Sequence, residues 1–207
     1  MTRRLPMFPL GMVLMPAQLL PLHVFEPRYR ELMHRLTAPG AVPELGVVLI
    51  ERGREVGGGD ERVGTGTLAR LLEHRQLPDG RWLALCAGAG RLRVVQWLPD
   101  DPFPQAEIED LPEPDWDPDD DGSLEAAEQL VREAIALAGE LGEAGVPADL
   151  QLSDDPVLRV WQLCAVAPLG PFDRQRLLEA PRRARLATLL EEVADVKQML
   201  AFRLGGR

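Results

Sequence analysis

The side chains that most often bind metals or act as nucleophiles are few in this chain. It has only three histidines and two cysteines among its 207 residues. The histidines do not fall at metal-ligand spacing; they are His23, His34 and His74. Cys86 and Cys164 lie in different halves among apolar neighbours, with no second cysteine near either. We therefore expect no metal site and two buried, reduced thiols.

Hydroxyl nucleophiles and phosphate-binding loops are also scarce. The two serines, Ser123 and Ser153, have no nucleophile elbow around them, and both are predicted to be N-caps where helices begin. The chain has no Gly-Lys-Ser/Thr phosphate loop, and its one lysine, Lys197, lies in an amphipathic stretch. The sequence thus predicts a protein that is not an enzyme and holds no cofactor.

One glycine pattern, from Gly64 to Ala69, formally matches the G-x-G-x-x-A dinucleotide fingerprint. That fingerprint needs a buried strand before it, a helix after it and an acid about 20 residues further on. Here a polar loop precedes the glycines, a turn signal at residues 77–80 follows too soon, and more glycines occupy the place of the acid. The pattern favours a strand whose glycines allow a bend or a close backbone approach.

Acidic residues gather between Asp100 and Asp121, a stretch without lysine or arginine. Prolines interrupt the acidic run, so residues 113–122 are expected to form an extended, solvated linker. The alternate aspartates also admit a calcium loop, but the glycine at loop position six is missing and Pro118 lies inside it.

Composition narrows the classes of partner. The net charge of −10 disfavours nucleic acid and anionic membranes, since both are bound chiefly through clustered lysine and arginine. The uncharged run from Leu5 to Leu22 has the outline of a signal peptide, but four prolines break it and no cleavage site follows. We expect a cytoplasmic protein whose 45% apolar content supports a packed core.

The stretch from Leu19 to Leu36 predicts a strand that runs into a helix. Pro27 fits the first helical position, where a missing N–H costs nothing, and Glu26 lies at the positive end of the helix dipole. Apolar residues then recur at helical spacing: Tyr29, Leu32, Met33 and Leu36.

Further strands are predicted in the first half. Residues 46–50 and 82–86 are continuous apolar runs, and residues 105–111 alternate between apolar and charged. Residues 77–80 (LPDG) carry a turn signal, and the glycine-rich residues 53–60 are expected to be a mobile hairpin tip. Short strands at this spacing with one inserted helix predict a small, partly open β-barrel.

The period changes to that of helices after residue 122. Apolar stripes predict helices from Ser123 to about Gly142, from Pro156 to about Ala167, from Asp173 to before Pro181, and over residues 186–200. The fold class is therefore α+β, with a C-terminal α-helical bundle.

Several blocks resemble the Lon N-terminal (substrate-binding) domain family in the expected order. The first are residues 5–10 (LPMFPL), 13–16 (VLMP) and 20–29 (LPLHVFEPRY). The later ones are residues 46–50, 63–65 and 90–94. The chain is most similar to the stand-alone bacterial members, which lack the ATPase and peptidase domains of the full protease. This resemblance implies a PUA-like β-barrel over residues 1–112, the linker at 113–122 and a helical domain at 123–207.

The resemblance also implies a function, namely recognition of protein substrates or partners. An extended, apolar polypeptide could dock in a groove and add main-chain hydrogen bonds to an open sheet edge. The candidate partner-binding residues are His23, Phe25, Glu26, Arg28 and Tyr29. For Phe25 and Tyr29 the alternative is a place in the core, and for Glu26 and Arg28 it is an ion pair that holds the turn.

Two other classes of function are alternatives to protein binding. PUA-like barrels include RNA-binding modules, although the net acidity counts against one here. A small-molecule site is the second alternative. The oligomeric state is left undetermined.

Overall fold

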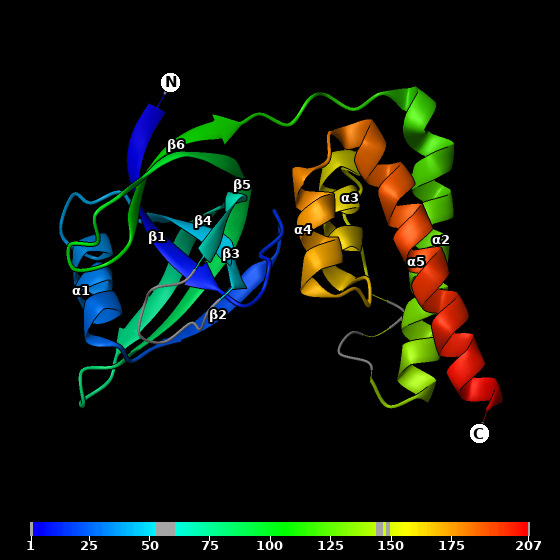
Figure 1. The fold of residues 1–207 in the computed structure, drawn as a ribbon, viewed down its shortest axis with the longest axis horizontal. Helices are drawn as coiled ribbons and strands as arrows, with labels where there is room; N and C mark the ends of the chain where they lie inside the picture. Colours follow the sequence, from blue (N-terminus) through cyan, green and yellow to red (C-terminus); the bar gives the residue numbers. More distant parts are fainter. Residues whose placement is uncertain (1, 53–60, 144–146, 148–149, 207) are drawn as a thin grey trace. The chain divides into compact units, whose positions relative to one another are not determined.

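The computed structural model describes residues 2–52, 61–143, 147 and 150–206 (Figure 1). The chain divides into two compact units, Met1–Glu113 and Pro114–Arg207. The predicted α+β class is confirmed. The predicted hairpin tip at residues 53–60 lies outside the described residues.

The first unit is built on a six-stranded mixed sheet. Its strands are β1 (Thr2–Leu10), β2 (Leu19–Val24), β3 (Glu44–Arg52), β4 (Glu61–Gln76), β5 (Trp82–Leu98) and β6 (Gln105–Leu111). They lie in the order β2-β5-β4-β3-β1-β6, and β1 runs parallel to β3 while the other pairs are antiparallel. Because β5 also pairs with β6, the pairings from β5 through β4, β3, β1 and β6 return to β5. Strand β2 lies outside this ring, on the edge of β5.

Helix α1 (Pro27–Leu36) is the helix inserted between β2 and β3. The apolar stripe predicted from its sequence is confirmed, because all four of its residues are buried: Tyr29, Leu32, Met33 and Leu36. They pack in one core cluster with residues of the sheet, among them Phe8, Val47 and Trp82. Burial of this stripe, at roughly 1.5–3 kcal/mol for each large apolar side chain, holds α1 on the sheet.

The predicted strands and the turn are also confirmed. Residues 46–50 lie in β3, residues 82–86 lie in β5, and residues 105–111 form β6. In β6 the alternation holds, since Ala106 and Ile108 are fully buried. At the turn, Gly80 has a φ of +82° and its N–H donates to the carbonyl of Leu77 at 2.9 Å.

The fingerprint-like glycines lie inside strand β4, which continues to Gln76. A Cβ atom on Gly66 would overlap the main-chain carbonyl of Val47 in the neighbouring strand β3. The glycine therefore serves a close backbone approach, as the alternative interpretation predicted.

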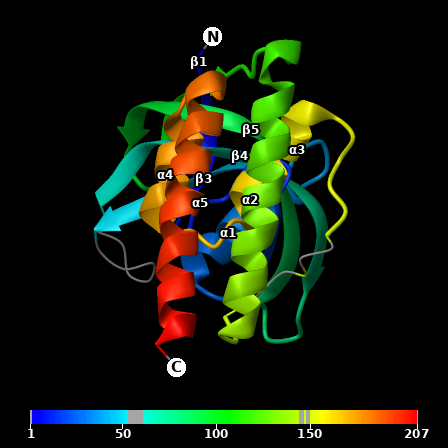
Figure 2. The same cartoon turned by 90° about the vertical axis from the view of Figure 1, so that its right-hand side faces the viewer.

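The second unit is helical within its described residues. After the short 3-10 helix η1 (Pro118–Asp120) come α2 (Asp121–Glu140), α3 (Pro156–Val166), α4 (Pro171–Glu179) and α5 (Arg182–Gly205). Helices α2 and α5 lie side by side and run in the same direction (Figure 2). The ion pair Glu133–Lys197, at 2.5 Å, joins the two helices directly. Asp120, just before α2, pairs with Arg182 at 2.7 Å, and Glu143, just after it, pairs with Arg203 at 2.5 Å. No helix among the described residues combines the length and the apolar character needed to cross a membrane.

Three predictions about helix starts were wrong. The helix predicted from Asp173 is α4, which already begins at Pro171. Ser123 is not an N-cap, because α2 begins two residues earlier at Asp121. Ser153 is not one either, since the Asp155 side chain caps α3 by accepting from the N–H groups of Val157 and Leu158. The linker predicted at residues 113–122 is not extended throughout, because η1 and the first turn of α2 occupy its second half.

One buried and one half-buried arginine donate to the carbonyls at the ends of two helices in this unit. The Arg185 guanidinium lies 3.6 Å from the Trp161 ring centroid and donates to the carbonyls of Leu177 and Ala180 at the end of α4. Arg174 donates to three carbonyls at and after the end of α3, and its burial lowers the pKa of its guanidinium. A cation at a helix C-terminus is favoured by the helix dipole, so these contacts replace solvent at the helix ends.

A strained turn sets the register of β2 on β5. The Gln18 N–H donates to the carbonyl of Met15 at 3.2 Å, and Ala17 between them has a φ of +61°. The Ala17 N–H donates to the Gly88 carbonyl, and the Gly88 N–H donates to the Gln18 carbonyl, both at 2.9 Å. The left-handed conformation of Ala17 crowds its Cβ atom, which is why glycine usually occupies such a position.

We predict that Ala17→Gly raises the free energy of unfolding by about 0.5–1 kcal/mol, because relief of the left-handed strain exceeds the added backbone entropy of glycine. Urea denaturation followed by tryptophan fluorescence measures the change. The control is Ala87→Gly in β5, which should lower stability by a similar amount. A destabilising Ala17→Gly would contradict this account of the turn.

Candidate functional site

A pocket of about 200 Å³ lies at the junction of β1, β2 and α1. It is mostly apolar and is lined by the end of β1, the second half of β2 and the turn into α1. Four of the five predicted site residues line it: His23, Phe25, Glu26 and Tyr29. Arg28 does not line it. The other lining residues, which the sequence analysis did not nominate, are Phe8, Pro9, Leu10, Pro21, Leu22 and Val24.

Two stacked aromatic rings form the inner wall of the pocket. The rings of Phe8 and Tyr29 have centroids 4.2 Å apart and planes 28° from parallel. Both residues are buried, with Tyr29 only 3% exposed. Tyr29 is therefore a core residue that also lines the pocket, and the stack ties α1 to β1.

The ion pair between Glu26 and Arg28 holds the turn into α1. The Arg28 Nε donates to the Glu26 carboxylate at 3.2 Å, and both side chains are largely buried. The Arg28 guanidinium also lies 4.5 Å from the centroid of the Tyr29 ring. The ion pair considered as the alternative role of Glu26 and Arg28 is thus present, and Arg28 also contacts the Tyr29 ring that lines the pocket.

The rim of the pocket carries exposed residues. Phe25 is 51% exposed, although burial of such a side chain would be favourable. His23 is also exposed, and its ring centroid lies 6.2 Å from that of Phe25. The core alternative therefore applies to Tyr29 and not to Phe25.

The edge of β2 beside the pocket has no strand partner among the described residues, because β2 pairs with β5 alone. The Gln18 carbonyl accepts from Gly88 next to β5, and successive strand residues direct their main-chain groups to opposite sides. The main-chain groups of Leu19, Pro21 and His23 are therefore directed away from β5, toward the open edge.

Two prolines explain why β1 and β2 do not pair across the pocket. Pro21 has no N–H to offer at the open edge of β2. Pro9 lies beyond the β1–β6 pairs, which end at Pro6, and it too lacks an N–H. Each proline removes a donor from the edge that lines the pocket, so the gap between the strands stays open.

The cysteine of this unit and two of its histidines make separate contacts: Cys86 lies in the core, and His34 and His74 both contact Trp82. Cys86 is buried in the core, and burial raises the pKa of its thiol to about 11. The His34 ring meets the Trp82 ring edge-on and the His74 ring is tilted to it, with centroid distances of 5.3 and 5.8 Å. Within the described part of the chain no group of three or more histidine, cysteine or acidic side chains could hold a metal ion.

The aspartates of the considered calcium loop are engaged by the protein itself. Asp117 accepts from the Asp119 N–H and pairs with Arg183, and these contacts lower the pKa of the Asp117 carboxyl. Asp121 accepts from the Trp116 indole at 2.6 Å. The two carboxylates thus contact different partners within the protein, and these contacts hold the start of α2 in place.

Comparison with known proteins identifies the family. The family model of the ATP-dependent protease La (LON) substrate-binding domain matches residues 4–195. The chain belongs to this family. The family resemblance predicted from the sequence is therefore confirmed.

Relatives and solved structures agree with this assignment. The chain is 30% identical to Lon protease 2 of Desulfotalea psychrophila over 66% of its length, and 29% identical to Lon protease 2 of Herpetosiphon aurantiacus over 96%. It spans only 18% and 25% of the lengths of those relatives. The crystal structure of a Lon N-terminal domain protein from Xanthomonas campestris is 25% identical, with a TM-score of 0.64, covering 91% of this chain and 98% of that one.

A second solved structure supports the fold alone. The N-terminal domain of Mycobacterium avium complex Lon protease is 14% identical, with a TM-score of 0.65, covering 93% of this chain and 99% of that one.

We predict that Tyr29→Ala and Phe25→Ala differ sharply in stability. Tyr29→Ala should lower the free energy of unfolding by about 3–5 kcal/mol, because it removes a buried, stacked ring. Phe25→Ala should cost less than about 1 kcal/mol, because half of its side chain is already in solvent. Urea denaturation of the two variants compares them. Equal costs would mean that Phe25 belongs to the core and not to the rim of a site.

Proposed function

We propose that this Lon substrate-binding domain is a cytoplasmic, non-catalytic protein-binding module that recognises extended or unfolded polypeptide segments. The observation that carries the proposal is an apolar pocket beside an open strand edge, with an exposed phenylalanine on its rim. Apolar pockets with a few polar groups are the usual ligand sites of proteins, and open edges accept extended chains. Family membership supports a substrate-recognition role.

In this proposal the bound segment lies along β2. Its main chain exchanges hydrogen bonds with the outward groups of Leu19 and His23, and one apolar side chain enters the pocket against Phe8 and Tyr29. Main-chain bonding makes the site tolerant of sequence, whereas the pocket selects for an apolar residue. Such selection suits the recognition of unfolded proteins, which expose apolar side chains in extended backbone.

The proposal includes an assignment of domains. Residues 1–112 form a PUA-like β-barrel, residues 113–122 connect the domains, and residues 123–207 form the helical domain. The ring of strand pairings that returns to β5 supports a barrel. The names of the relatives, which are Lon proteases, favour a role in delivering bound clients to proteolysis.

Binding to an array of short peptides tiled from unfolded proteins tests the proposed function. We predict that apolar peptides are retained and that Phe25→Ser weakens their binding about tenfold, the loss expected when one apolar contact of about 1.4 kcal/mol is removed. Phe202→Ser is the matched control, because Phe202 is 83% exposed on α5 and lies outside the pocket.

Single-stranded RNA and a library of small molecules serve as parallel probes. Salt-sensitive RNA binding without peptide binding would contradict the proposal and favour an RNA-binding module. Selective binding of small molecules alone would favour a small-molecule site.

A further inference from the structure

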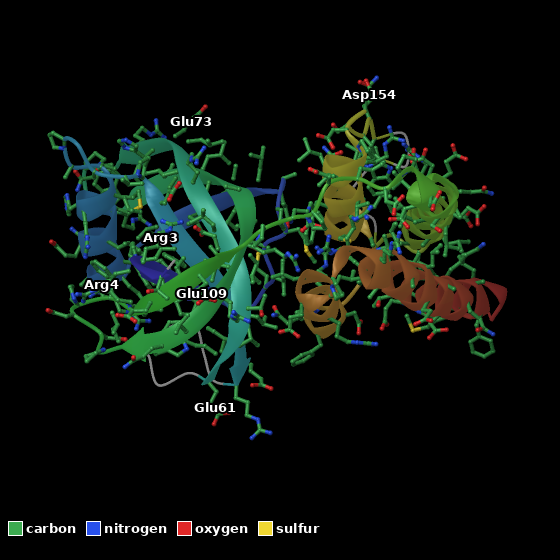
Figure 3. The ribbon with its side chains drawn as sticks, turned by 90° about the horizontal axis from the view of Figure 1, so that it is seen from above. Arg3, Arg4, Glu61, Glu73, Glu109 and Asp154 are labelled. Atoms are coloured by element: carbon green, nitrogen blue, oxygen red, sulfur yellow. The ribbon has the colours of Figure 1, made fainter. Side chains whose placement is uncertain are left out.

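A second pocket of the first unit is rich in arginine although the chain is acidic. It has a volume of about 340 Å³ and lies between the first half of β1, the end of α1 and the segment before β3. Its lining residues include Arg3, Arg4 and Arg35. Figure 3 shows Arg3 and Arg4 close together on β1, toward the side of the unit that carries the blue helix α1.

The first of these arginines is already neutralised. Arg3 pairs with Glu44 at 3.0 Å and with Asp110 at 3.1 Å, and these carboxylates raise the pKa of its guanidinium. Glu44, the one acid of the pocket lining, also pairs with Arg70 at 3.1 Å. Its charge is therefore shared between two arginines and does not compensate the others.

The other two arginines have no ion pair with the described residues. Arg35 donates weakly to Gln105 at 3.5 Å, and its guanidinium lies 5.7 Å from the Phe103 ring centroid. Most N–H donors of the Arg35 guanidinium are therefore available to a ligand. Arg4 is exposed and shares a face of β1 with Phe8, which stacks on α1. Glu107 of β6 lies opposite Arg4 in the register without closing an ion pair with it.

The walls of the pocket are apolar. Leu36, Ala41 and Val42 line it, and Val42 is 66% exposed. The half of β1 that borders the pocket, residues 3–6, precedes the β1–β3 pairs, which begin at Met7. The pocket thus combines two guanidinium groups, an exposed valine and a strand edge that β3 does not cover.

We propose that this pocket binds a carboxylate of a polypeptide, either its C-terminal carboxylate or an aspartate or glutamate side chain. Guanidinium groups bind carboxylates through paired, charge-assisted hydrogen bonds. Val42 and Leu36 would contact the apolar part of the bound residue. A polyanion such as nucleic acid fits less well, because only two cations are uncompensated and the whole chain carries a net charge of −10.

The inference rests on the proposed function only in taking polypeptide as the ligand. The two sites are separate, because no residue lines both pockets. The arginine pocket lies at the C-terminal end of α1 and the aromatic pocket at its N-terminal end. Variants of one pocket can therefore be made without altering the other.

The test compares three labelled heptapeptides of one apolar sequence by fluorescence anisotropy at low salt. One has a free C-terminal carboxylate, one is amidated, and one is amidated with an internal glutamate. We expect the wild-type protein to bind the free acid about tenfold more tightly than the amide, the usual effect of one charge-assisted contact. If the glutamate peptide binds more tightly than the plain amide, the pocket also accepts a side-chain carboxylate. If it binds no more tightly, the pocket accepts only the C-terminal carboxylate.

Single substitutions assign the effect to the pocket. Arg4→Gln and Arg35→Gln should each reduce the ratio of the affinity for the acid to that for the amide to about one. Glu107→Gln should increase this ratio, because it removes a negative charge opposite Arg4 that repels the bound carboxylate. Arg75→Gln is the matched control, since it removes an equal charge from an exposed position of β4 outside the pocket. Arg4 is exposed, so its variant keeps the fold even if Arg35→Gln does not.

Three results would overturn the inference. Equal binding of the acid, the amide and the glutamate peptide by the wild-type protein refutes the carboxylate site and leaves the proposed function intact. An acid preference that survives both arginine substitutions places the carboxylate elsewhere. Failure of all three peptides to bind refutes the proposed function and this inference together.

The Phe25→Ser variant separates the two sites. If it loses binding of the amidated peptide but still prefers the free acid, the carboxylate site acts independently of the aromatic pocket.

Discussion

The open edge between β1 and β2 is the constraint on which the candidate site depends. Two neighbouring strands with complementary main-chain groups would ordinarily close into a continuous sheet. Pro9 and Pro21 remove N–H donors from the two edges that line the pocket, so closure would leave carbonyls without partners. The two prolines therefore keep the gap between β1 and β2 open, and the rings of Phe8 and Tyr29 line the pocket at this gap.

Other contacts in the first unit fix the positions of β2 and α1 around this gap. The Met15–Gln18 turn fixes the register of β2, and the close approach of Gly88 allows it, because a Cβ atom there would overlap the Met15 carbonyl. Helix α1 is fastened by its buried stripe and by the pair of Glu26 with Arg28 at its start. A pocket whose walls are set by the backbone and by a packed helix needs little reorganisation to bind, which lowers the entropic cost of binding.

Much of this fold could be predicted from local sequence signals, and the exceptions have a common cause. The start of α1 at Pro27 and its buried stripe follow from residues within one helix, so the prediction was right. The start of α2 was predicted two residues too late, because the 3-10 helix η1, capped by Asp117, leads directly into α2 at Asp121. The ion pair of Asp120 with Arg182, 62 residues away in the sequence, is a further contact that no local pattern around Ser123 indicates.

The candidate site shows the same division. Phe25 and Tyr29 were nominated together, and the helical stripe already placed Tyr29 on the buried face of α1. Its stacking partner Phe8 comes from β1, and no local pattern joins the two rings. The sequence did carry a signal for the open edges, since the prolines between Leu5 and Leu22 favour edge strands over a continuous sheet. Arg4 and Arg35 could not be joined from sequence, because their meeting depends on the same long-range pairing.

The central claim is that a bound polypeptide adds to the open edge of β2. Amide hydrogen exchange at individual residues tests it most directly, with a saturating concentration of an apolar peptide that the peptide array has shown to bind. The account predicts that exchange of the Leu19 and His23 N–H groups slows on binding, while the N–H groups of Leu20 and Val24, which face β5, change little. Unchanged exchange at Leu19 and His23 under saturation would contradict strand addition at this edge.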